Sequence, residues 1–274
     1  MGSESGSKLK RFIYQDIHIL ISSTIMKLSF IIMLKEVKRV MSQPMPPSYM
    51  AYDRTIVVFS PDGRLLQVEY ARQMVKNGST SLGTVTSNAV ILGAHKPSMP
   101  LAVTKSYKKI YEIDSHISLV SSGSLADARD LVGFARVKAQ VNRITYGEPI
   151  SVTSLTKYIC DRKHLVTQYA GVRPYGVGLL IGGIDEGGPK LFETEPSGTM
   201  IEWKAQAIGR GAEKARKVLQ KGYKDGMNIE EGTKLLVKAL KSGEKTIGSE
   251  NIEIVVVNKG EIKKIPQEQL KKLI

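Results

Sequence analysis

Few residues of this chain have the type and spacing needed for chemistry. The four histidines, His18, His95, His116 and His164, are scattered and lack the short intervals that metal ligands usually show. The single cysteine, Cys160, lies in an apolar helical stretch, which indicates a buried structural thiol rather than a nucleophile. The sequence therefore predicts no metal site and no cofactor.

Paired glycines raise the question of a phosphate-binding loop. Gly182-Gly183 and Gly187-Gly188 are followed by no Gly-Lys-Ser/Thr motif and by no Gly-rich turn from a strand into a helix. We expect ordinary turn glycines at both places.

The charge balance is basic. The 274 residues carry 40 Lys and Arg against 26 Asp and Glu, a net charge of +14. Such a surplus raises the possibility of a nucleic-acid partner. However, the lysines are scattered, without interleaved aromatic residues or a recognised nucleic-acid motif, so a basic nucleic-acid-binding protein is kept only as an alternative. One cysteine excludes an internal disulfide framework and fits a reducing compartment.

One stretch near residue 60 leads the chain into a β domain. Ser60-Pro61-Asp62-Gly63 has the composition of a tight turn. Apolar residues then recur at helical spacing over residues 65–77, and Asn77-Gly78 ends the segment as a helix C-cap does. The β-prone residues 79–86 come next, so a turn and a short helix precede the first strand.

The rest of the chain alternates between strands and helices. We predict strands at residues 89–95, 108–113, 117–121, 177–184, 190–193, 199–208 and 252–258. We predict helices at residues 124–146, 152–169, 212–222, 229–241 and 267–273. The buried stripe of the first of these helices is expected at Leu125, Ala128, Leu131, Val132, Ala135, Ala139 and Val141. This order predicts an α+β fold in which helix pairs flank the sheets.

The first 51 residues differ from the remainder. Residues 1–40 contain broken apolar runs at 12–14, 17–21 and 28–34, interrupted by Asp16, His18 and Lys27. A transmembrane helix and a secretory signal are alternatives, but an extension of doubtful origin upstream of Met41, disordered or non-native, is preferred. Residues 41–51, rich in Pro, Ser and Met, are expected to form a flexible tail, and residues 52–274 the domain.

The string YDR…FSPDGRLLQVEYA…GST, beginning at Tyr52, resembles the signature of proteasome α-subunits, the non-catalytic outer rings of a barrel-shaped protease. Two later segments, Ser122 to Arg129 and Gly171 to Val177, are also similar to this family. The resemblance covers the chain from about Met50 to its C-terminus and is nearest to the archaeal version. It implies a four-layer αββα sandwich, the fold of N-terminal-nucleophile hydrolases.

Relatives with this fold hydrolyse peptides through an N-terminal Thr, Ser or Cys, whose free α-amine acts as the base. Against the catalytic β-subunit pattern, Ser79 stands at the nucleophile, His95 at the acidic residue and Lys109 at the catalytic lysine. Ser79 is internal and His95 is no carboxylate, so the resemblance implies no active site. An autoprocessing hydrolase that uses Ser79, released after Gly78, remains the alternative.

In the resembling family, a pocket between neighbouring α-subunits receives the C-terminal carboxylate of an activator. The positions that match this docking pocket are Lys109, Gly78 and Gly123, and the glycines are expected to leave room for a peptide. Ser124 departs from the Leu of a relative. The alternative is a solvated lysine at a strand edge.

The resemblance also implies a gate and a pore. Tyr52, Asp53, Pro61 and Tyr70 match the cluster that holds the gate open, and a hydrogen-bonded Asp and two Tyr hydroxyls suit that role. The loop Tyr169, Ala170, Gly171 and Val172 matches the constriction of the pore, with Ala170 in place of a second Gly. The alternatives are capping of the first helix and an ordinary helix-to-strand turn.

The partners that the resemblance implies are six identical α-subunits in a seven-membered ring, the β-subunits, an ATP-driven unfolding ring and unfolded polypeptide in transit. We expect a cytoplasmic protein with no nucleic-acid or membrane partner.

Overall fold

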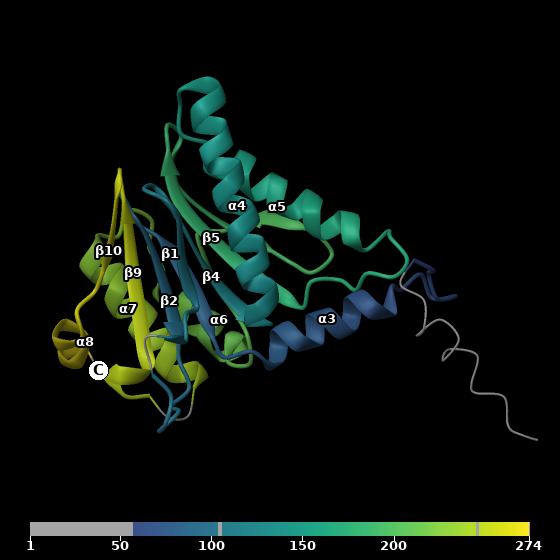
Figure 1. Ribbon diagram of the computed structural model, residues 1–274. Coiled ribbons are helices and arrows are strands. Elements are labelled where there is room, and N and C mark those ends of the chain that lie inside the picture. The colour runs from purple at the N-terminus through teal and green to yellow at the C-terminus, as the bar shows by residue number, and fades with distance from the viewer. Residues whose placement is uncertain (1–56, 104–105, 245–246, 274) are drawn as a thin grey trace, which may run out of the picture. The chain divides into compact units, whose positions relative to one another are not determined.

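Two five-stranded antiparallel sheets lie face to face in the computed structural model, which describes residues 57–103, 106–244 and 247–273 (Figure 1). The first sheet has the order β10-β9-β2-β1-β8 and contains β1 (Ser81–Val85), β2 (Val90–His95), β8 (Ala205–Ile208), β9 (Ile252–Asn258) and β10 (Glu261–Lys264). The second sheet has the order β3-β4-β5-β6-β7 and contains β3 (Ile110–Asp114), β4 (Ile117–Gly123), β5 (Val177–Asp185), β6 (Gly188–Thr194) and β7 (Met200–Glu202).

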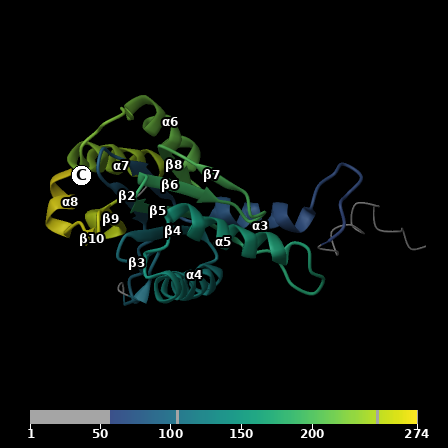
Figure 2. The ribbon, with the colours of Figure 1, turned by 90° about the horizontal axis from the view of Figure 1, so that it is seen from above.

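Helix pairs cover the outer faces of both sheets (Figure 2). The second sheet packs against α4 (Leu125–Tyr146) and α5 (Val152–Val166), and the first against α6 (Ala212–Gly222) and α7 (Ile229–Gly243). Three further helices are α3 (Leu66–Asn77), the short 3₁₀ helix η2 (Ser249–Asn251) and α8 (Gln267–Leu273). The α+β class and the four-layer αββα sandwich are confirmed.

Successive side chains of a strand point to opposite faces of the sheet, so apolar strands in two stacked sheets build three core layers. In the first sheet, Leu82 and Ile91 face α6 and α7, whereas the adjacent Val90 and Leu92 face the second sheet. The inter-sheet layer is completed from the second sheet by residues such as Val120, Leu180 and Leu191. Because both faces of each sheet are covered, its central strands are buried along their length.

The segment 199–208 is the largest difference from the predicted elements. The sequence predicts one strand there, but the segment forms β7 of the second sheet and β8 of the first, with Trp203 and Lys204 between them. The Trp203 amide donates to the Leu191 carbonyl (2.8 Å), and the Val85 amide donates to the Lys204 carbonyl (2.8 Å). Consecutive residues therefore bond to different sheets, which periodicity along one strand cannot reveal.

Three smaller differences have local causes. The helix predicted over 152–169 ends at Val166, after which the Thr167 and Gln168 amides donate three residues back, to the His164 (3.0 Å) and Leu165 (3.1 Å) carbonyls, instead of four. Val141 is 48% exposed and lies outside the buried stripe of α4. The strand β10 is not predicted, since its sequence Glu-Ile-Lys-Lys is mostly charged and it gains its pairing from a hairpin turn at Gly260, where φ is +78°.

In the described ranges, no helix has the length and apolar character required to cross a bilayer.

Candidate functional site

The turn before α3 forms as its residues predict. The Gly63 amide donates to the Ser60 carbonyl (2.8 Å) and Gly63 has φ +72°, while the Arg64 amide donates to the Ser60 hydroxyl (3.1 Å). Pro61, in this turn, and Tyr70, in the second turn of α3, are both exposed. Tyr52 and Asp53 lie outside the described residues, so the gate cluster stays a prediction.

Two glycines, Gly78 after α3 and Gly123 at the end of β4, permit three chain segments to meet. A Cβ built on Gly78 would lie 2.4 Å from the Gly123 nitrogen, and one on Gly123 would lie 2.3 Å from the Gly176 carbonyl oxygen. Gly78 has φ −63°, so close approach rather than a left-handed conformation requires glycine there. Within this chain, Gly78 and Gly123 therefore bring backbones together instead of leaving the open space that we expected for a peptide.

Lys109 is buried against Ser79. Its side chain is 1% exposed, and Nζ donates to the Ser79 carbonyl (2.6 Å), the Ser79 hydroxyl (2.7 Å) and, less closely, the His95 carbonyl (3.4 Å). Burial lowers the pKa of Lys109 to about 7, against the opposing attraction of Glu244. The alternative of a solvated lysine at a strand edge is therefore wrong.

Ser79, His95 and Lys109 thus come together, but without the groups that hydrolysis requires. The Ser79 hydroxyl donates to the His95 carbonyl (3.0 Å), and the peptide nitrogen of Ser79 follows Gly78 in an unbroken chain. An amide nitrogen cannot take up the proton of the hydroxyl as a free α-amine would. The site therefore has the contact between a hydroxyl and a lysine ammonium, but it lacks the free α-amine that would act as the base.

A carboxylate that the sequence did not predict lies near Ser79 and Lys109. Glu244, directly after α7, accepts from the Thr80 amide (2.9 Å) and hydroxyl (2.7 Å) and pairs with Arg210 (2.7 Å). Its carboxylate also lies 3.6 Å from His95 Nδ1. Burial acts to raise the pKa of Glu244, but hydrogen bonds from Arg210 and Thr80 outweigh it and hold the pKa below its ordinary value.

No local pattern marks Glu244, because only the fold brings the end of α7 to the start of β1. Arg210 and Lys109 both lie near this carboxylate, and Arg210 already balances its charge. Because burial lowers the pKa of Lys109 to about 7, the lysine carries only part of a positive charge at neutral pH. An anion bound beside Lys109 would favour its charged form.

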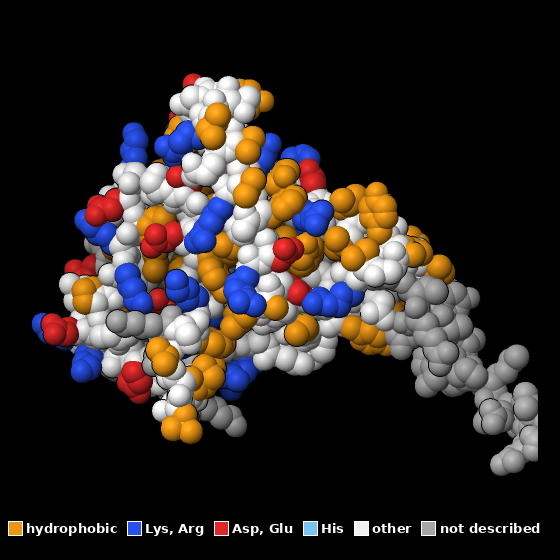
Figure 3. Space-filling model, viewed as in Figure 1, with side chains coloured by type: hydrophobic (Ala, Val, Ile, Leu, Met, Phe, Trp, Pro, Cys, Tyr) orange, Lys and Arg blue, Asp and Glu red, His pale blue; other side chains and the backbone are white. Residues whose placement is uncertain are grey.

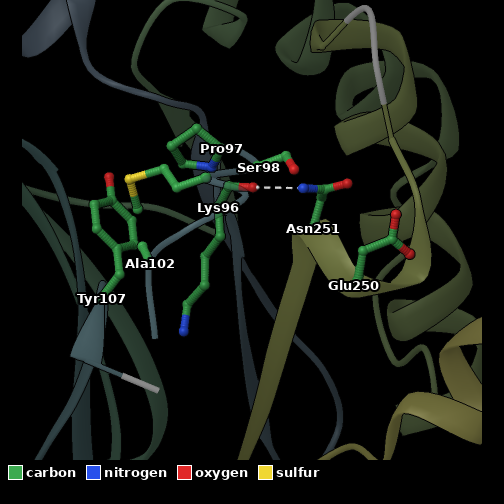
Figure 4. A pocket seen from close by; sticks show the side chains of 8 residues that line it. Lys96, Pro97, Ser98, Ala102, Tyr107, Glu250 and Asn251 are labelled. Atoms are coloured by element: carbon green, nitrogen blue, oxygen red, sulfur yellow. Dashed lines mark hydrogen bonds between the residues drawn. The ribbon is translucent and has the colours of Figure 1, made fainter. Parts of the chain in front are cut away.

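A hollow next to this cluster is small. It has a volume of about 100 Å³, and its walls include Lys96, one residue after His95, and Tyr107, two residues before Lys109 (Figure 4). The Asn251 side chain donates to the Lys96 carbonyl (3.0 Å), and the Lys96 ammonium pairs with Glu253 (2.6 Å). Since ligand pockets usually measure about 300–1,000 Å³, a peptide would need surface beyond this hollow.

The predicted pore loop lies between α5 and β5. Tyr169 is 56% exposed and Val172 46% exposed, and Gly171 has φ +86°. The β5 end of the loop approaches Gly123, through the contact of Gly176 described above. The chain that follows the predicted pore positions therefore reaches the predicted docking position Gly123 through Gly176.

Comparison with known families agrees with this geometry. Residues 75–257 match the model of the proteasome subunit family, and residues 52–73 match the N-terminal signature of A-type proteasome subunits. The chain belongs to the proteasome subunit family.

Individual relatives indicate the branch of the proteasome family. The proteasome alpha subunit of Methanocaldococcus jannaschii is 47% identical over 235 residues, which cover 85% of this chain and 89% of that protein. The proteasome alpha subunit of Thermococcus sibiricus is 48% identical over 231 residues (83% and 88%), and that of Methanopyrus kandleri 46% over 229 residues (83% and 93%). Together with the N-terminal signature, they identify a non-catalytic, archaeal-type α-subunit of the proteasome core particle.

Removal of the Ser79 hydroxyl is expected to leave proteolysis unchanged. Ser79→Ala should neither alter the turnover of peptides by the assembled particle nor change where this chain begins, because no free α-amine accompanies the hydroxyl. Peptide hydrolysis by particles with wild-type or Ser79→Ala α-subunits, with equal assembly confirmed by gel filtration, makes the comparison. A loss of peptidase activity in intact particles, or a wild-type mass that begins at Ser79, would support the alternative of an autoprocessing hydrolase.

Proposed function

We propose that seven copies of this chain close into the outer ring of a proteasome core particle and control the access of unfolded polypeptides to β-type subunits. Head-to-tail contacts between identical subunits produce closed rings of this kind. The N-terminal signature over residues 52–73 carries the proposal, because it spans the four residues predicted to hold the gate open and most of α3. We further propose that the protein works in the cytoplasm.

Exposed apolar side chains support assembly with other subunits. On α3 and the segment before it, Phe59, Tyr70 and Met74 are 62%, 53% and 48% exposed. On α4, Val137, Val141 and Ile144 recur at helical spacing and are all exposed, and hydrophobic side chains run along this helix (Figure 3). Apolar surface on two separate helices is typical of a subunit whose partners cover it.

The cluster around Lys109 supports a docking role. We propose that the C-terminal carboxylate of an ATP-driven unfolding ring binds at Lys109, beside Gly78 and Gly123, in a pocket completed by the neighbouring subunit. Arg210 already balances Glu244, so a docked carboxylate would meet Lys109 and favour its charged form, which burial alone disfavours. The small size of the hollow beside it is consistent with a peptide site that needs a second subunit.

The gate and the pore complete the proposal. Tyr52, Asp53, Pro61 and Tyr70 hold the tail of residues 41–51 in its open arrangement, and the tip of Tyr169, Ala170, Gly171 and Val172 narrows the channel behind it. The exposure of Tyr169 and Val172 supports this, since a tip that lines a channel has to be accessible.

Electron microscopy of the purified chain, alone and mixed with β-type subunits, tests the proposal. We expect rings with seven-fold symmetry, and stacked rings in the mixture. A monodisperse monomer in both samples would overturn it, as would a ring with another symmetry. Retention of duplex DNA that falls with added salt would favour the nucleic-acid alternative instead.

A further inference from the structure

The loop between α5 and β5, residues 167–176, has a free tip and a fixed base. No hydrogen bond links residues 169–172 to any other residue that the structure describes. By contrast, Arg173, Tyr175 and Gly176 each bond to the first turns of α4 or to the residue before it. The position of the tip therefore depends on how its base is held.

Asp127 holds the base at two points. Its carboxylate accepts from both terminal nitrogens of the Arg173 guanidinium (2.7 Å each) and from the Gly176 amide (2.8 Å). An Arg–carboxylate pair with two parallel hydrogen bonds fixes direction as well as distance. Asp127 thus ties Arg173 and Gly176, which precede β5, to the first turn of α4.

The surroundings of Asp127 keep it in place and charged. Its side chain is 9% exposed, and it lies in the first turn of α4, where a carboxylate is favoured by the helix dipole. Burial acts to raise the pKa of Asp127, but hydrogen bonds from Arg173 and Gly176 outweigh it and hold the pKa below its usual range. The carboxylate therefore remains ionised near neutral pH.

Two further bonds strengthen the base. The Tyr175 hydroxyl donates to Asp130, one turn further along α4 (2.8 Å), and the Ser124 amide donates to the Gly176 carbonyl (2.9 Å). The start of α4 therefore holds the base of the loop through several hydrogen bonds. The tip of the loop makes none with the described part of the chain.

We propose that Asp127 is a positioning residue of the pore: through its pair with Arg173 and its bond to the Gly176 amide, it sets how far residues 169–172 reach into the channel. This inference rests on the proposed function of the loop. In a ring of seven subunits, seven such clamps fix the aperture, and their loss widens it. The chemical class of partner that senses the aperture is an extended polypeptide.

The first test measures the loop itself, by hydrogen exchange in assembled particles. Asp127→Asn is expected to speed exchange of the Gly176 amide about tenfold or more, because a bond to a charged acceptor becomes one to a neutral acceptor. Arg173→Gln should speed exchange of the Gly176 and Ser124 amides by a smaller factor, because the bond from Gly176 to Asp127 remains. Asp161→Asn, which removes an exposed carboxylate of α5 paired with Lys157, is the matched control.

The second test measures the aperture with one unfolded polypeptide, offered in a reduced form and in a form closed by a disulfide. The closed form has to pass as two strands. We expect its degradation rate, relative to that of the reduced form, to rise about threefold or more in Asp127→Asn and Arg173→Gln. Arg173→Lys, which keeps the charge, should restore part of the wild-type ratio. Leu155→Ala, a core change in α5, controls for lost stability and should leave the ratio unchanged.

The two tests separate the inference from the function on which it rests. Unchanged exchange in both clamp variants would show that Asp127 does not hold the loop and would overturn the inference. Faster exchange with an unchanged ratio would show that the loop is held by the clamp but does not line the constriction, which would overturn the pore role proposed for residues 169–172. Faster exchange together with a raised ratio supports both.

Discussion

Replacing Lys109 with Met is expected to abolish activator-stimulated protein degradation, while ring assembly and the basal hydrolysis of small peptides continue. Methionine keeps most of the length of the side chain and removes the ammonium that the docked carboxylate is proposed to meet. Truncating one partner of a buried charge pair costs about 2–5 kcal/mol, roughly thirtyfold or more in affinity for each tail. Because several tails dock at once, stimulation should disappear rather than decline.

The control for Lys109 has to separate docking from local structure, since Lys109 also bonds to Ser79. Ser79→Ala removes one acceptor of the ammonium and keeps the charge, so it should retain stimulation. Lys109→Arg should retain it in part, because a guanidinium is charged but larger. Full stimulation of the Lys109→Met particle would assign the lysine to a structural role, and a lower melting temperature without loss of stimulation would lead to the same conclusion.

Deletion of residues 42–51 is expected to produce the largest gain of activity, a rise in the hydrolysis of small peptides by assembled particles without any activator. The sequence Ser-Gln-Pro-Met-Pro-Pro-Ser-Tyr-Met-Ala is rich in Pro and poor in large aliphatic residues, so it is released at little cost in free energy. Peptidase rates of the full chain, of a chain that begins at Met41 and of the deletion variant make the comparison.

The three chains differ in which segments would meet at the pore. Residues 1–40 contain apolar runs, and seven copies that met there would bury apolar area worth about 25 cal/mol per Å². We therefore expect the full chain to be the least active and the least responsive to an activator. Equal rates in all three chains would show that the tail is no gate, and an equal response of the full and Met41 chains would refute the argument about plugging.

Most of the fold could be predicted from the sequence because its signals are local. Turn residues at Ser60-Pro61-Asp62-Gly63 and the helical spacing after them located α3, and short, nearly continuous apolar runs located β2 and β9. The crossing of residues 200–208 between sheets could not be predicted, because the two sheets offer the same kind of β-prone pattern to a passing strand.

The candidate site was less accessible to prediction, since its contacts are long-range. Spacing could not show that Glu244 and Arg210 lie beside Ser79 and Lys109, nor that Asp127 binds Arg173. The glycines show the limit well: their type was informative, but space for a ligand and close packing of backbones both require glycine. Only the folded chain distinguishes these two reasons, and at Gly78 and Gly123 it shows close packing.

The order of strands in the two sheets affects how the chain folds while the ribosome synthesises it. The strands of the second sheet, β3 to β7, follow one another in the sequence. They come after β2 and before β8 of the first sheet. The strand β2 has to wait for its neighbour β9, Ile252–Asn258, before the first sheet is complete. At roughly 5–20 residues per second, translation leaves the inner face of the second sheet without its full cover for several seconds.

During that interval, the apolar side chains of Val120, Leu180 and Leu191 are not yet fully covered by the strands that bury them in the folded protein. A nascent chain with this exposed apolar surface is a substrate for a chaperone at the ribosome exit. It can also aggregate with other nascent chains translated from the same mRNA. Expression at low temperature or with a holding chaperone should therefore raise the yield of soluble subunit.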